Sequence, residues 1–182
     1  MRKTMLVFLM LVSSLVLMTS AQALTLRIPD TTGYVGKTVT IPVEIENASN
    51  VGSVELVVLY NDSILSVKKV EKGSLLKGLI TSNTSEPGII AINLVDSNGI
   101  NGDGEIIKIT FDILAEGNTP LIIQNAKAYD VNTYTDLPVD TTNGLLTIST
   151  GAPSSQTPGF EVITFLSALI ILIAILLIYN RK

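Results

Sequence analysis

An acidic turn rich in Asn and Gly holds the densest group of metal-ligand side chains in the chain. Between 96 and 105 the sequence reads DSNGINGDGE, with five oxygen donors at Asp96, Asn98, Asn101, Asp103 and Glu105. A calcium loop of the EF-hand type needs Gly at its sixth position, and Asn101 occupies that place. We therefore expect no metal site in this turn, and the sequence indicates no cofactor.

The residue types most used in catalysis are missing from the 182-residue sequence. It contains no Cys and no His, which excludes thiolate chemistry, Ser-His-Asp catalysis and the usual zinc sites. Pairs of carboxylates serve glycosidases, but a small β-sandwich leaves little room for a substrate cleft. We expect a protein that is not an enzyme.

A strand pattern between 52 and 60 has an unusually apolar outward side. Successive residues of a strand point to opposite faces, so a core-facing set is expected at Val54, Leu56, Val58 and Tyr60. The outward set is then Ser53, Glu55, Val57 and Leu59. Because a solvated face is normally more polar, we predict a partner-binding surface here, extended on the adjacent strand by Ala91, Asn93 and Val95. The alternative is a face covered by a loop or only mildly apolar.

The elements that position these residues are expected to be strands throughout. Period-2 alternation recurs, and we find no convincing amphipathic helix between 24 and 149. We predict nine short strands, at 24–28, 39–46, 54–60, 64–70, 79–82, 90–95, 107–113, 121–126 and 145–149, separated by turns rich in Asn, Gly and Pro. This number of strands in about 125 residues predicts a β-sandwich.

The two ends of the chain are expected to direct export and anchoring. Residues 1–23 have a basic start, a short apolar run and an Ala-Gln-Ala site, which is typical of a signal peptide. Residues 150–159 form a linker, and 160–182 contain an uncharged stretch long enough to cross a membrane, with a basic tip behind it. The expected location is the extracellular face of the cell membrane, with attachment through the C-terminus.

The part between these ends is acidic. Of 16 acidic residues 15 lie between 24 and 157, and of 12 basic residues 8 lie there, which gives a net charge of −7. Phosphate binding needs clustered Lys and Arg, so we expect neither a nucleic-acid partner nor binding to anionic lipid.

Five segments taken together resemble the cohesin domain, the receptor module of cellulosome scaffolds. They lie at 33–43, 50–65, 72–76, 97–106 and 109–111, and the Tyr60-Asn-Asp-Ser-Ile-Leu corner and the turn from Gly99 to Gly104 are the most specific parts. The resemblance covers 24–149. It implies a nine-stranded jelly-roll sandwich that binds dockerin, a small helical module that carries its own calcium.

The resemblance also bears on the candidate residues. It implies that the strand from 52 to 60 meets dockerin through an Asn-x-Asp pair, which falls on Ser53 and Glu55 in this sequence. Neither residue is identical to that of the family. The turn at 96–105 is implied to be structural.

The segment Pro158-Gly159-Phe160 before the apolar stretch looks like the PGF-type sorting signal of archaeal surface proteins. In that family an archaeosortase removes the C-terminal helix, and a lipid replaces it. The alternative is an ordinary single-pass anchor.

Three sequons of the Asn-x-Ser type predict N-glycosylation, at Asn47, Asn61 and Asn83. They fall in expected turns or strand ends, and chance occurrence in a chain rich in Asn, Ser and Thr is the alternative.

For the domain as a whole, the rival to a docking module is a carbohydrate-binding or surface-layer adhesion module. The absence of Trp from the sequence disfavours sugar binding, because such modules stack sugars on exposed aromatic rings.

Overall fold

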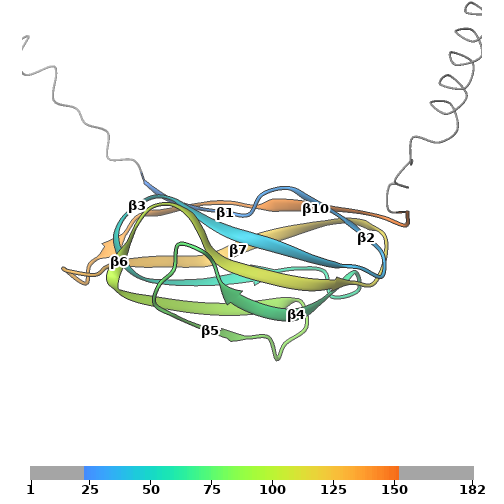
Figure 1. The fold of residues 1–182 in the computed structure, drawn as a ribbon, viewed down its shortest axis with the longest axis horizontal. Coiled ribbons are helices and arrows are strands. Elements are labelled where there is room, and N and C mark those ends of the chain that lie inside the picture. Colours follow the sequence, from blue (N-terminus) through green and yellow to red (C-terminus); the bar gives the residue numbers. More distant parts are fainter. Residues whose placement is uncertain (1–22, 152–182) are drawn as a thin grey trace, which may run out of the picture. The chain divides into compact units, whose positions relative to one another are not determined.

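Alternating aliphatic residues build a β-domain from residues 23–151, the part of the chain that the computed structural model describes (Figure 1). These residues form ten strands. Their bounds are β1 Leu24–Arg27, β2 Thr31–Tyr34, β3 Thr38–Leu59, β4 Leu65–Lys72, β5 Leu79–Asn83, β6 Ile89–Ile113, β7 Gly117–Asp130, β8 Asp136–Leu137, β9 Val139–Thr142 and β10 Gly144–Ser149.

The strands pair in two groups. One group has the order β5–β6–β3–β7 and uses the first half of β6 and the second half of β3. The other has the order β4–β6–β3–β1–β9 and uses the remaining halves of the same two strands. Strand β10 lies parallel to β2 and antiparallel to the start of β7, whose later residues pair with β3, so β7 links the β2–β10 pair to the first group. This arrangement confirms the predicted all-β sandwich.

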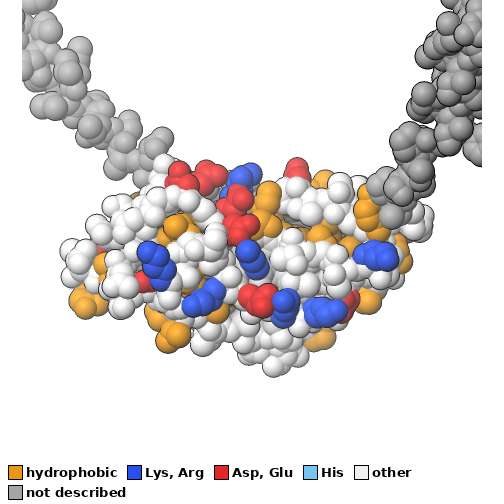
Figure 2. Space-filling model, viewed as in Figure 1, with side chains coloured by type: hydrophobic (Ala, Val, Ile, Leu, Met, Phe, Trp, Pro, Cys, Tyr) orange, Lys and Arg blue, Asp and Glu red, His pale blue; other side chains and the backbone are white. Residues whose placement is uncertain are grey.

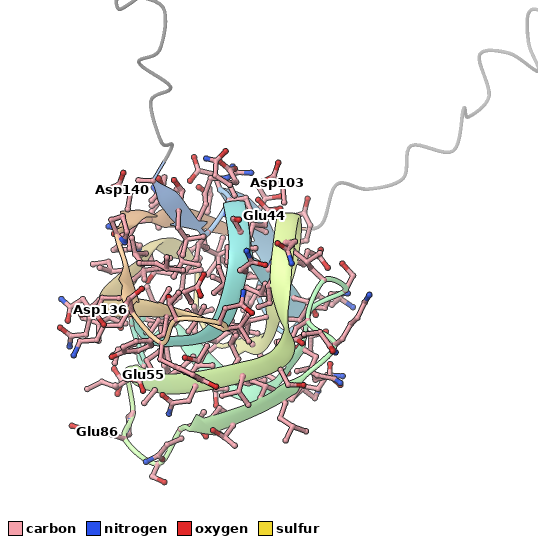
Figure 3. All side chains as sticks on the ribbon, turned by 90° about the vertical axis from the view of Figure 1, so that its left-hand side faces the viewer. Glu44, Glu55, Glu86, Asp103, Asp136 and Asp140 are labelled. Carbon is pink, nitrogen blue, oxygen red and sulfur yellow. The ribbon has the colours of Figure 1, made fainter. Side chains whose placement is uncertain are left out.

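The two longest strands bend together where they pass from one group to the other. Figure 3 shows β3 (cyan) and β6 (yellow-green) running side by side through the bend. Four register shifts interrupt their pairing between Val43 and Ser53, and Asn47 and Asn50 adopt positive φ angles of 59° and 53°. On β6, Gly102 has a φ of 85°, a left-handed conformation that suits Gly. Bulges of this kind let a strand turn a corner without leaving the ladder.

The core lies between the inner faces of the two groups. Aliphatic side chains dominate it, and Phe111 is its fully buried aromatic residue. The Tyr60 ring packs against Phe111 with ring centroids 5.3 Å apart. Val54, Leu56 and Val58 of β3 all point into this core, as the alternation predicted.

The strand count differs from the nine expected. The stretches expected at 39–46 and 54–60 form one strand, β3, which ends at Leu59. Residues 90–95 and 107–113 likewise belong to one strand, β6, because the segments between them keep pairing through the bend. The turn expected at 99–104 is therefore part of β6. Strands β2, β8 and β9 were missed because they are short and mostly polar.

Three expectations lie outside the described residues: the signal peptide at 1–23 apart from its last residue, the sorting tripeptide Pro158-Gly159-Phe160, and the apolar segment at 160–182. Within residues 23–151, no helix is long and apolar enough to cross a membrane.

Candidate functional site

One outer surface of the domain gathers all seven residues that the sequence predicted for partner binding. It consists of the outward side chains of β5, β6, β3 and β7, and we call it the four-stranded face. Ser53 pairs with Val95, Glu55 with Asn93, and Val57 with Ala91, so the two central strands bring these residues together in rows. Leu59 follows in the next row, opposite Ile89.

The outer strands extend each row beyond the predicted residues. Strand β5 adds Leu79 beside Val95, Thr81 beside Asn93 and Asn83 beside Ala91. On the other side, β7 adds four residues: Tyr129 beside Ser53, Lys127 beside Glu55, Gln124 beside Val57 and Ile122 beside Leu59. Sequence reasoning missed the β5 and β7 residues. The sequence predicts a strand at 79–82, but it does not show which strand these residues flank.

The face combines exposed aliphatic groups with one opposed pair of charges. Leu79 is 71% exposed and Val95 is 50% exposed, which is unusual for aliphatic side chains in adjacent strands. Glu55 and Lys127 are directly opposite each other, yet neither is among the ion pairs found in residues 23–151. Their charged groups are therefore available to a partner.

The outer surface around β4 has a different character. Figure 2 shows Lys and Arg side chains spread over this part of the molecule, with acidic groups between them. Several are already paired: Lys68 with Asp112 at 3.3 Å, and Lys69 with Glu71 at 2.8 Å. Lys72 donates a hydrogen bond to the carbonyl of Gly78. This surface is charged and internally satisfied, as a solvated face normally is.

A hollow of about 400 Å³ lies at one end of the four-stranded face. Ser53, Val95 and Tyr129 line it, together with Tyr134 from the turn between β7 and β8. Tyr134 has a φ of 57° and is 83% exposed. The exposed ring of Tyr134 therefore adds apolar surface beside the row of Leu79 and Val95.

Asp130 holds the turn that carries Tyr134. Its Oδ1 accepts hydrogen bonds from the backbone N–H groups of Asn132 and Thr133, both at 2.8 Å, and from the Thr133 hydroxyl at 3.0 Å. The backbone hydrogen bond from Thr133, followed by that from Asn132, lowers the pKa of Asp130 below its ordinary value of 3.8. The ionised carboxylate therefore stabilises the turn at neutral pH.

The acidic turn uses its oxygens to brace the backbone. Asp96 is only 4% exposed, and its carboxylate accepts hydrogen bonds from the N–H groups of Lys77, Gly78 and Asn98, each at 3.0 Å. The side chain of Asn101 accepts a hydrogen bond from the N–H of Asn50 at 2.9 Å. These oxygens hold the bend of β3 and β6 and tie the segment before β5 to β6.

Asp103 makes the remaining brace of this turn. It accepts a hydrogen bond from the N–H of Asn47 at 2.6 Å, across the bend. In Figure 3, Asp103 lies with Glu44 and Asp140, apart from Glu55 on the four-stranded face. The acidic residues of the bend and the carboxylate of the candidate site therefore belong to different parts of the surface.

The three sequons occupy different places. Asn47 lies in the bend, and its Nδ2 donates to the carbonyl of Ala23 at 3.5 Å. Asn61 follows the end of β3, where its Oδ1 accepts from the N–H of Ser63 at 3.0 Å. Asn83 ends β5 on the four-stranded face. All three side chains are exposed.

Comparison with known proteins points to one family. The sequence model of the cohesin domain matches residues 24–148. No curated protein matches the chain significantly.

Solved structures agree with this match. A non-cellulosomal cohesin from the archaeon Archaeoglobus fulgidus is 30% identical, with a TM-score of 0.66 over 71% of this chain and 93% of that one. The cohesin CaCohA2 of Clostridium acetobutylicum is 28% identical, with a TM-score of 0.64 over 74% of this chain and 96% of that one. A dockerin complex of CaCohA2 matches at 27% identity and a TM-score of 0.66, over 70% of this chain and 100% of that one.

Proposed function

The chain belongs to the cohesin domain family, and from this premise we propose that its four-stranded face binds a calcium-loaded dockerin module on another protein. Cohesin domains are non-catalytic binding modules, which confirms the expectation that the chain is not an enzyme. A homologous cohesin, CaCohA2, was crystallised in complex with a dockerin.

The observation that carries the proposal is the composition of the four-stranded face. Exposed Leu79 and Val95 provide apolar area, and the unpaired charges of Glu55 and Lys127 stand at its centre. Protein interfaces commonly place an apolar, well-packed area beside a few polar groups that fix the register of the partner. The family resemblance implies that Ser53 and Glu55 fall at the places of the family's Asn-x-Asp pair, and both side chains have hydrogen-bonding oxygens.

The dimensions of the face suit a small helical module. Three gaps between four neighbouring strands span about 14 Å, and seven residues of β3 span about 20 Å. A helix with its side chains is about 10–12 Å across, so the face accommodates one helix fully and part of a second. A docked helix would cross the central rows that contain Glu55 and Val57.

The direct test is capture of partners by the full chain in the presence of calcium. The detergent-extracted protein serves as bait for surface and secreted proteins of its own cells, and mass spectrometry identifies what is bound. We expect proteins that contain a dockerin module, released by a calcium chelator. Partners that never contain a dockerin, or whose binding ignores the chelator, would refute the proposal.

A pair of charge-reversing variants locates the surface. Glu55→Lys changes the centre of the four-stranded face, and Lys69→Glu makes a charge change of equal size on β4. Breaking a charge pair within an interface costs about 2–5 kcal/mol, or roughly 30-fold or more in Kd. We expect this loss for Glu55→Lys and near-normal binding for Lys69→Glu. Equal binding by both variants would exclude the face.

The proposal includes an extracellular location, with attachment through the C-terminus. It is supported by the signal-peptide pattern at 1–23 and by Pro158-Gly159-Phe160 ahead of the apolar stretch and its basic tip. Removal of this stretch by an archaeosortase leaves a lipid-bearing protein that ends near the linker. Intact-mass spectrometry of the mature protein tests this, and recovery of peptides covering 170–182 as the major form would refute the processing.

Carbohydrate binding is the second candidate, because one observation favours it. The hollow at the end of the four-stranded face contains Tyr129 and Tyr134, and tyrosine rings provide surfaces on which sugars stack. Reproducible hits of the full chain on a glycan array, lost in Tyr134→Ala, would favour this reading over dockerin binding.

A further inference from the structure

We propose that Asn83 is an N-glycan acceptor and that its glycan blocks docking on the four-stranded face. The blocking role rests on the proposed function of this face. The acceptor role does not, because it depends only on the position and chemistry of Asn83.

Asn83 stands on the same face as the partner-binding residues. Ile80 packs against the core, and Ser82 pairs with Ile92, which is 1% exposed, so alternate residues of β5 point outward. Asn83 is one of these outward residues. It pairs with Ala91 of β6, and Ala91 pairs with Val57 of β3. Two strand spacings of about 4.8 Å therefore separate Asn83 from Val57, a key residue of the proposed interface.

The segment around Asn83 is accessible to a glycosylating enzyme. All residues from 81 to 87 are exposed, and Asn83 is the last residue of an edge strand. Its Oδ1 accepts a hydrogen bond from the N–H of Ser85 at 3.0 Å, while its Nδ2 has no hydrogen-bond partner within residues 23–151. In Figure 3, Glu86 of the same segment projects into solvent on the side of the view that carries Glu55.

The chemistry is transfer of an oligosaccharide from a lipid phosphate carrier. Nδ2 of Asn83 attacks the anomeric carbon of the first sugar, a C–N bond forms, and the bond from that carbon to the phosphate oxygen breaks. The lipid phosphate leaves with the bonding electrons, and a base of the transferase takes one amide proton. The Asn-Thr-Ser sequon supplies the acceptor motif.

The other sequons do not share this position. Asn47 is held in the bend, where its backbone N–H donates to Asp103 and its Nδ2 donates to Ala23. Asn61 lies beyond the end of β3, in the turn that precedes β4. A glycan on Asn47 leaves the four-stranded face open, whereas a glycan on Asn83 lies directly over the row of Ala91 and Val57.

A glycan at this position opposes docking for a steric and a solvation reason. It fills space that the partner must occupy, and its hydroxyl groups keep water over aliphatic side chains that an interface needs to desolvate. The protein without a glycan on Asn83 would thus bind its partner, and the protein with this glycan would not.

The first experiment tests the acceptor and the shielding without any partner. The full chain is produced in a host that N-glycosylates exported proteins, and peptide mass spectrometry measures occupancy at Asn83. Because the sequence has no Cys, a single Asn93→Cys substitution provides a unique label site, two residues from the partner of Asn83. Thr147→Cys on β10 is the matched control, because it is also exposed but belongs to a strand that does not contribute to the face.

We expect a glycan on Asn83 and loss of labelling of Asn93→Cys by a polyethylene-glycol maleimide. Adding Asn83→Gln should restore this labelling, and Thr147→Cys should label equally in both backgrounds. An unglycosylated Asn83 would overturn the acceptor role. Equal labelling of Asn93→Cys with and without the glycan would overturn the shielding.

The second experiment tests docking, with the calcium-loaded dockerin of the Clostridium acetobutylicum complex as the probe. We expect capture by the Asn83→Gln chain and loss of capture by the glycosylated chain, with Asn47→Gln giving no rescue. Equal capture by both forms would overturn the blocking role and leave the proposed function intact. If the Asn83→Gln chain captures no dockerin while the glycan still shields Asn93→Cys, the proposed function fails for this dockerin and the blocking role fails with it, whereas the acceptor role and the shielding stand.

Discussion

Two neighbouring residues of β3 give the sharpest test of the site, because they point to opposite faces of the sheet. Val58 is 0% exposed and lies in the core, whereas Val57 is partly exposed on the four-stranded face. We expect Val58→Asp to abolish folding and Val57→Asp to preserve it while preventing partner binding. The same chemical change one residue apart makes each variant the control for the other.

The magnitudes follow from the burial of each side chain. Val58→Asp loses about 1.5–3 kcal/mol of apolar burial and adds several kcal/mol for placing a carboxylate in the core. Together these are comparable to the whole free energy of unfolding, about 5–15 kcal/mol for a typical domain. Val57→Asp loses mainly strand propensity, about 1 kcal/mol or less, which lowers Tm by about 4 °C for a domain of this size.

Thermal unfolding followed by circular dichroism, together with dockerin capture, measures both effects. The reasoning is refuted if Val57→Asp unfolds the domain and Val58→Asp does not, since a slip of one residue exchanges the two faces. It is equally refuted if both variants melt near the wild-type temperature. Full capture by a folded Val57→Asp protein would remove β3 from the interface.

Further predictions concern the elements that support the face. Asp96→Ala leaves three backbone N–H groups without their acceptor. We expect urea denaturation to show that the free energy of unfolding falls by about 3 kcal/mol or more. A decrease of less than about 0.5 kcal/mol would contradict the structural role of Asp96. Gly78→Ala brings a Cβ to 1.9 Å from the carbonyl oxygen of Val95, so the backbone must move and Tm should fall. An unchanged Tm would contradict this, because it would show that the segment before β5 accepts a Cβ without strain. The turn held by Asp130 should keep its stability at all pH values above 3.8 and lose it as pH falls through the lower folded-state pKa, because the ionised form makes the hydrogen bonds. An NMR titration of the Thr133 amide should therefore have a midpoint below 3.8, and a midpoint at or above that value would refute the assignment.

The period-2 pattern was enough to predict the sandwich and the orientation of each residue in the predicted stretch of β3. Every second residue from Val54 to Val58 is buried, because a strand that has one face in a core must alternate. The same local rule placed Ser53, Glu55 and Val57 outward. The family resemblance rested on turns and corners, whose residues are constrained by backbone geometry and are therefore recognisable in a sequence.

The neighbours of β3 were decided by the tertiary structure. Lys127 faces Glu55 only because β7 pairs with β3 through a bulge at Asn125, where φ is 51°, and no local pattern reports such a pairing between residues 72 positions apart. The role of Asp96 was similarly hidden. In the sequence Asp96 has the side chain of a calcium ligand. In the fold its carboxylate accepts hydrogen bonds from N–H groups of the segment that precedes β5.

In the bend of β3 and β6, local residue types predicted the backbone angles, whereas pairing with a distant segment decided the secondary structure. Asn and Gly at 98–104 predict a turn because they tolerate positive φ, and positive φ is indeed present at Gly99, Gly102 and Gly104. The chain nevertheless continues as strand through this segment, because the bend of β3 lies against it and satisfies its backbone groups. By itself the sequence determined which residues alternate, where the backbone bends, and which Asn residues carry sequons. Only the tertiary structure decided that Asn83 shares a face with Glu55, because strand pairing is a contact between distant segments and local residue preferences do not specify it.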